Sequence, residues 1–291
     1  MKAPLLLAAL YGAADAKLLP LRSTSSSKVL ALRGGSTGQL INAMSALNVV
    51  SGLQAWTYPE ETLGLYGIKS VSESESFIMR CVGGVQLASA VRPSLSRVAA
   101  RLTHASATAH TLPQATLLVG KTDIDKAMIA LLYVHSFVCL GNIPIIENLK
   151  VAKGPVLATV AVMVALAELG RQGVIPANVM AYVVGAFYIL PGLVEVLSPQ
   201  TTFESFGFAL SPLGKTLGSN FGAIKVSAAL FLAVTKLTGK AGLGLAAAAA
   251  VGVLNCFKVA ASAGETGIEK PGIIVWALLQ SVIAILAYKG A

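Results

Sequence analysis

Two charged residues fall inside long apolar stretches, where they could bind an ion or a polar solute. Lys225 lies near the middle of one stretch, in FGAIKVSAAL, and Glu195 lies about one helical turn from the end of the preceding stretch. An ionisable residue at membrane depth is energetically expensive and is therefore a candidate functional site. Because the loop containing Pro199 joins the two stretches, both charges approach from the same membrane face. Two interpretations follow: an ion pair between Glu195 and Lys225, or an interfacial Glu195 and a lysine that extends alone to the membrane surface.

The other residues with catalytic or ligand chemistry do not form a site by their spacing. His135, in LLYVHSFVCLGN, lies in an apolar segment, where a hydrogen-bonded packing role is more common than ligation, and a second haem ligand is not evident. Cys81, Cys139 and Cys256 lie in apolar segments without CxxC spacing. We therefore expect no metal, no cofactor and no catalytic residue, and an enzyme is disfavoured. Glu195, Lys225 and His135 are the candidate binding residues.

The composition indicates that these residues lie in a membrane protein. Hydrophobic residues make up 55% of the chain, charged residues only 12%, and the mean hydropathy is +0.74, whereas roughly a quarter of a soluble domain is charged. Most apolar segments approach the ~20 residues that a helix needs to cross a bilayer. The sequence predicts an all-α, polytopic membrane protein with eight transmembrane helices, at about 40–58, 76–92, 125–143, 154–170, 178–198, 216–235, 241–262 and 272–289. The second segment could instead be re-entrant, because it is short and contains Arg80 and two adjacent glycines.

The loop charges predict the orientation of these helices. Eight crossings place nine Lys and Arg residues on the face of the N-terminus, with the first 39 residues omitted, and six on the other face. Because Lys and Arg favour the cytoplasmic side, both termini are expected in the cytoplasm or an equivalent compartment such as a stroma. Arg97 and Lys240 are thus expected on the N-terminal face, and Glu73 and Glu265 on the opposite one.

The chain contains an internal repeat. SGLQAWTYPEETLGLYG, at 51–67, and PGLVEVLSPQTTFESFG, at 191–207, share Gly, Leu, Pro, Thr and Gly at positions 140 residues apart. Pro59 and Pro199 cannot continue a helix, and Gly67 and Gly207 permit a turn with positive φ. Each half holds four predicted helices, and an even number means that both halves enter the membrane in the same direction. The sequence therefore predicts two parallel four-helix repeats, at 40–170 and 178–291.

The correspondence continues into the next helix of each half after a shift of one residue. Gly83 then matches Gly222, and both would allow close helix packing. The positions that match Glu195 and Lys225 are Ala55 and Gln86, so the charges belong to the second half alone.

An apolar helix, a proline near its end, an aromatic-glycine turn and a glycine-containing second helix together resemble the DoxX-like four-helix membrane modules, here duplicated in tandem. The resemblance implies a fold more than an activity. No functional residue is assigned from it.

The N-terminus has the pattern of a targeting sequence. Residues 1–16, MKAPLLLAALYGAADA, read as a signal peptide cleaved after Ala16, and residues 17–39 form a basic, Ser/Thr-rich, transit-like segment. Together they resemble the bipartite plastid-targeting presequence of algae with secondary plastids, which implies a plastid membrane. The alternative is a signal peptide followed by a disordered basic linker, in a membrane of the secretory pathway.

The expected partners are lipids. Arg97 and Arg101 lie on one side of a predicted interfacial helix that would contact anionic headgroups. Nucleic acid is not expected, because the basic residues are spread along membrane flanks without a recognition module. Two functions stay open: a small-solute or ion transport or binding protein with its site between the two repeats, and a noncatalytic membrane scaffold or assembly protein. The sequence identifies neither a solute nor a protein partner.

Overall fold

The computed structural model describes residues 27–90 and 124–291, in which every regular element is a helix. Eight of these helices have 18 or more residues: α2 (Ser27–Thr57), α4 (Glu73–Ala90), α6 (Ile124–Gly141), α8 (Gly154–Arg171), α9 (Ala177–Leu197), α11 (Pro212–Thr238), α12 (Ala241–Thr266) and α13 (Lys270–Lys289). They overlap the eight predicted apolar segments. Three six-residue helices follow α2, α6 and α9: α3 (Pro59–Gly64), α7 (Ile143–Asn148) and α10 (Pro199–Glu204). The predicted all-α class is confirmed.

Six helices of the described chain are long and apolar enough to cross a membrane. They are α6 together with α7, and α8, α9, α11, α12 and α13. The first two long helices fall outside this set, and α4 carries three charges, at Glu73, Glu75 and Arg80. Outward-facing leucines such as Leu190, Leu254 and Leu278 are 62–69% exposed. An apolar outer surface of this kind is compatible with an integral membrane protein; the number of eight crossings stays a prediction.

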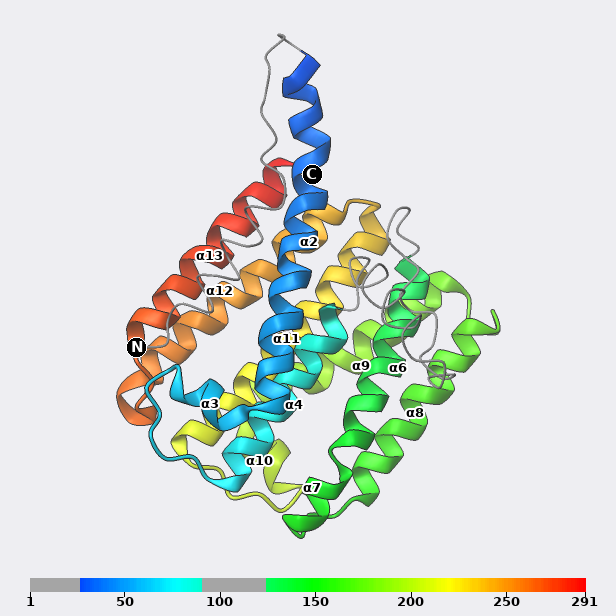
Figure 1. Ribbon diagram of the computed structural model, residues 1–291. Coiled ribbons are helices and arrows are strands. Elements are labelled where there is room, and N and C mark those ends of the chain that lie inside the picture. The colour runs from blue at the N-terminus through cyan, green and yellow to red at the C-terminus, as the bar shows by residue number, and fades with distance from the viewer. Residues whose placement is uncertain (1–26, 91–123) are drawn as a thin grey trace, which may run out of the picture.

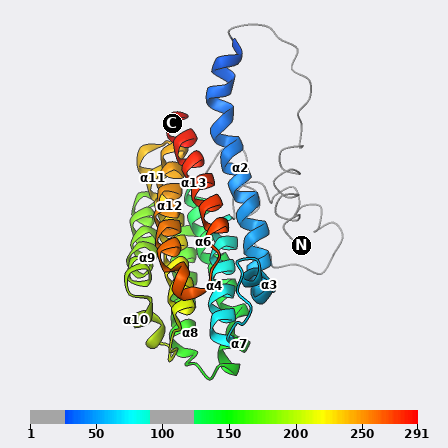
Figure 2. The same cartoon turned by 90° about the vertical axis from the view of Figure 1, so that its left-hand side faces the viewer.

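The long helices pack as a bundle around α11 (Figures 1 and 2). In the most apolar 18-residue stretch of α11, 61% of the residues are buried, whereas only 17% are buried in the corresponding stretches of α8, α12 and α13. The helix packs on α4, α9 and α12, while α4 packs on α2 and α6. The two outermost helices, α8 and α13, pack on α6 and α12. The helices thus form two series of packed neighbours, α2–α4–α6–α8 and α9–α11–α12–α13, and the two series meet at α4 and α11.

Several described residues that the sequence assigns to one membrane face lie at the same end of the bundle. The short helices α3, α7 and α10 lie toward one end (Figure 1), and there the Glu269 backbone N–H donates to the Tyr66 carbonyl over 2.9 Å. At the other end Lys236 and Asp125 form an ion pair of 2.7 Å. These contacts agree with the predicted alternation of helix direction.

Proline and glycine take the same positions in two turns, at 59–67 and 199–207. Pro59 and Pro199 are the first residues of α3 and α10, where the missing N–H costs no helical hydrogen bond. Gly67 and Gly207 follow at φ +86° and +87°, the left-handed region that a residue with Cβ rarely adopts. The chain thereby reverses toward α4 in one case and toward α11 in the other.

Two helix crossings depend on glycine. A Cβ added to Gly83 would lie 2.6 Å from the Gly52 carbonyl oxygen, and one added to Gly222 would lie 2.4 Å from the Gly192 carbonyl oxygen. Since the opposing atoms belong to the backbone, α2 and α4 approach backbone to backbone, and so do α9 and α11. The second predicted segment, α4, is one uninterrupted helix.

Several predicted features lie outside the described residues. They are the signal peptide at 1–16, the first part of the transit-like segment at 17–39, and the basic helix with Arg97 and Arg101. Residues 27–39 of the transit-like segment form the start of α2.

Candidate polar site within the helix bundle

A buried ion pair lies between α9 and α11. Lys225 Nζ is 2.8 Å from Glu195 Oε1, and the side chains are only 10% and 5% exposed. The lysine ammonium also lies 4.9 Å from the centre of the Phe221 ring, within the range of a cation–π contact. The structure therefore agrees with the ion-pair interpretation and not with a lysine that extends alone to the surface.

The glycines of the α9–α11 crossing bring the two charges together. A Cβ on Gly222 would lie 2.6 Å from Glu195 Cβ, so the base of the Glu195 side chain packs directly against this glycine. Lys225 lies three residues further along α11 and therefore shares that face of the helix. Without a close approach of the two backbones, the short glutamate side chain would not reach the ammonium inside the bundle.

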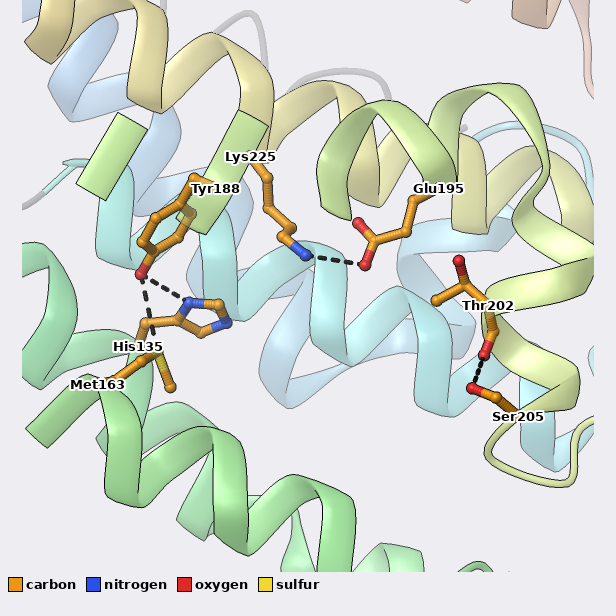
Figure 3. A network of polar contacts seen from close by, with 7 residues as sticks. All are labelled: His135, Met163, Tyr188, Glu195, Thr202, Ser205 and Lys225. Carbon is orange, nitrogen blue, oxygen red and sulfur yellow. Dashed lines mark hydrogen bonds and ion pairs between the residues drawn. The ribbon is translucent and has the colours of Figure 1, made fainter. Parts of the chain in front are cut away.

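His135 belongs to a second polar contact next to the ion pair (Figure 3). Its Nδ1 lies 2.8 Å from the Tyr188 hydroxyl, and the hydroxyl lies 3.9 Å from Met163 Sδ. Tyr188 is completely buried and His135 is 7% exposed. Figure 3 shows Lys225 between Tyr188 and Glu195. This hydrogen bond connects α6 of the first half to α9 of the second half.

The site retains one unused acceptor. Glu195 Oε2 is buried and has no hydrogen-bond partner. A buried carboxylate oxygen left alone is costly, so it favours an added donor such as a proton, a cation or a solute N–H or O–H group. Among the described residues no three His, Cys, Asp or Glu side chains gather as a metal site. The buried charges and the free acceptor have the chemistry to bind an ion or a polar group.

The predicted residues take different places in the structure. Glu195, Lys225 and His135 lie close together, whereas Pro59, Gly67, Pro199 and Gly207 form turns and Gly83 and Gly222 lie at helix crossings.

Tyr188 was missed by the sequence analysis, although a signal for it exists. It precedes Glu195 by seven residues, which is two helical turns, so both side chains lie on one face of α9. A buried tyrosine at that spacing indicates a hydrogen-bond partner nearby.

No protein-family model matches the chain, and neither a curated protein nor a solved structure matches it.

Proposed function

We propose that this chain is a multi-pass membrane protein that binds or transports a small solute or an ion at a site between two repeats. The observation that carries the proposal is the buried Glu195–Lys225 pair with its unpartnered Oε2. A structural role alone gives little reason to keep such a pair, because well-packed hydrophobic residues often replace a buried ion pair without loss of stability. A residue pair that binds or moves a charge must be ionisable.

The surroundings of the pair support a site between the halves. Glu195, Lys225 and Tyr188 come from the second half, whereas His135 comes from the first. Motion of one half against the other would change the His135–Tyr188 hydrogen bond and the environment of the charges. Helices related as parallel repeats commonly hold their substrate between them.

Eight crossings and two parallel four-helix repeats form part of the proposal. Arg80 donates to the Trp56 carbonyl over 2.8 Å, and Ser219, the matching position in the second half, donates to the matching Val196 carbonyl over 3.2 Å. The helix crossings at Gly83 and Gly222, and the two matching series of packed helices, support the same duplication. The resemblance to DoxX-like modules favours a repeat of four helices.

The proposed location is a plastid membrane, with a membrane of the secretory pathway as the alternative. The pattern of residues 1–39 supports it. Anionic headgroups beside Arg97 and Arg101 are the proposed lipid contact.

The proposed topology is tested by cysteine labelling. Single cysteines at Arg97, Lys240, Glu73 and Glu265, in a chain whose three native cysteines are replaced, are treated with an impermeant maleimide from each side of the membrane. We expect positions 97 and 240 to react from the side of the N-terminus and positions 73 and 265 from the other side. Lys240, Glu73 and Glu265 are exposed, so burial does not limit their labelling. If positions 73 and 97 react from the same side, the eight-crossing proposal is wrong.

Ion movement is tested in proteoliposomes. Purified chain is reconstituted with a trapped pH-sensitive dye, and inward gradients of H⁺, Na⁺ or Cl⁻ are imposed, each ion followed by its own indicator. We expect flux of at least one ion above that of protein-free liposomes, and its loss in the Glu195→Gln/Lys225→Met double variant. The Glu147→Gln/Lys153→Met variant is the matched control, because that pair is about half exposed. No flux from the wild-type chain, together with a stoichiometric protein partner that copurifies from native membranes, would favour the scaffold function.

A further inference from the structure

The bundle contains a cavity between helices of both halves. It has a volume of about 270 Å³, and its walls include residues of α2, α4, α11, α12 and α13. This volume is slightly below the roughly 300–1,000 Å³ of most small-molecule pockets. Its polar wall carries five carboxamide side chains, those of Asn48, Gln86, Asn220, Asn255 and Gln280.

The described lining residues include no Asp, Glu, Lys, Arg or His. Most of the wall is apolar, with Met44, Leu131, Phe231 and Trp276 among its residues. Tyr66, in the loop after α3, also lines the cavity, and burial raises the pKa of its phenol, so this group is neutral as well. A charged molecule would enter without a counterion, and transfer of an unpaired charge into such a site is strongly unfavourable.

Two residues that line the cavity each have a buried polar atom without a hydrogen-bond partner. Ser45 is 2% exposed and its Oγ makes no hydrogen bond, although a helical serine usually bonds the carbonyl four residues earlier, as Ser51 does with Leu47 over 2.7 Å. Asn255 donates to Asn220 over 2.7 Å, yet its own Oδ1 is buried without a partner. A buried polar atom without a hydrogen-bond partner is unfavourable. Both oxygens can accept a hydrogen bond and the serine hydroxyl can also donate one, so a hydroxyl group on an occupant would suit both.

The repeat alignment relates this cavity to the ion-pair site. Gln86 matches Lys225, and Asn48 stands 140 residues before Tyr188. Where the second half carries a charged lysine and a large tyrosine, the first half carries two neutral carboxamides that line the cavity. The cavity thus occupies the position of the ion-pair site in the other half, with neutral polar groups in place of charges.

We propose that the cavity binds an uncharged amphiphile, namely a molecule with an apolar ring or chain and a hydroxyl group. The apolar wall contacts the ring or chain. Ser45 and the carboxamides, Asn255 among them, form hydrogen bonds with the polar group. The proposal is independent of ion movement at Glu195, because none of the residues that it uses belongs to the ion pair or to its hydrogen bonds.

The binding is measured by quenching of Trp276. The chain has two tryptophans, so Trp56→Phe leaves Trp276, at the cavity wall, as the reporter. Three probes share one brominated ring and differ in charge: 4-bromobenzyl alcohol is neutral, 4-bromobenzoate is an anion and 4-bromobenzylamine is a cation. In lipid nanodiscs we expect saturable quenching by the alcohol and only weak, unsaturable quenching by the two ions.

Variants distinguish binding of the probe in the cavity from its partitioning into the lipid. Ser45→Leu with Asn255→Leu fills the cavity and should abolish saturable quenching, while Thr159→Val, an exposed change on α8, should leave it intact. If the double variant does not fold, Ser45→Val alone provides the test and should weaken binding. Three results would each overturn the proposal: equal quenching by all three probes, quenching unchanged in the filled variants, or no quenching at all.

Discussion

Lys225→Met and Glu195→Gln are each expected to destabilise the chain in detergent by about 3–5 kcal/mol, because each change leaves one charge buried without its partner. The lysine side chain is 10% exposed and the glutamate side chain 5%, so water cannot replace the missing partner without rearrangement of the bundle. Thermal unfolding of each purified variant, followed by far-UV circular dichroism, measures the change.

The double variant distinguishes an ion pair from two unrelated losses. Glu195→Gln with Lys225→Met removes both charges, so it should recover a substantial part of the stability lost by either single change. The same cycle at Glu147 and Lys153, whose side chains are 50% and 55% exposed, should give changes of at most about 1 kcal/mol. Additive losses at Glu195 and Lys225, or no loss from either single variant, would contradict the buried pair and remove the reason to place an ion site there.

The ion pair shows which part of the candidate site the sequence predicts and which part it does not. Glu195 and Lys225 stand out because charges are rare in apolar segments, and the loop at Pro199 places them near one membrane face. Whether they meet depends on the rotation of α9 and α11 about their own axes, which no residue spacing within one helix determines. Contact at Gly192 and Gly222 sets this rotation in the structure.

The turns were easier to anticipate than the start of the first long helix. Pro59 and Gly67 impose local backbone constraints, so their roles follow from residue type alone. The helix α2 begins at Ser27, whereas the apolar segment was predicted from about residue 40. The segment GGSTG at 34–38 reads as a linker because glycine is a weak helix former. Once a helix is nucleated, however, each added residue costs little, so α2 extends through it.

The cavity could not be predicted from the sequence. Its carboxamides come from α2, α4, α11, α12 and α13, which span more than two hundred residues of the chain. Single Asn and Gln residues in apolar helices more often bond a neighbouring helix than line a site. Only the packing of the five helices shows that these five side chains face one space.

Gly222→Ala is expected to be strongly destabilising although it adds a single methyl group. The new Cβ would lie 2.4 Å from the Gly192 carbonyl oxygen, 2.6 Å from Glu195 Cβ and 2.9 Å from the Val196 nitrogen. Because two of these three atoms belong to the backbone of α9, no change of rotamer relieves the contact, and α9 must move away from α11. Overpacking of this kind costs about 1–3 kcal/mol or more. The separation would also lengthen the Glu195–Lys225 contact.

Gly185→Ala is the matched control for that substitution, because both glycines lie in long apolar helices and a Cβ at Gly185 meets nothing within 4 Å. Alanine there should be neutral or should stabilise α9 by up to about 1 kcal/mol, since glycine is the weaker helix former. Gly83→Ala should resemble Gly222→Ala, because its Cβ would lie 2.6 Å from both the Gly52 carbonyl oxygen and the Trp56 nitrogen. Thermal unfolding of the three variants measures the difference. Similar melting temperatures for Gly222→Ala and Gly185→Ala would show that α9 and α11 are not in backbone contact, and the geometric basis for the buried ion pair would fail with it.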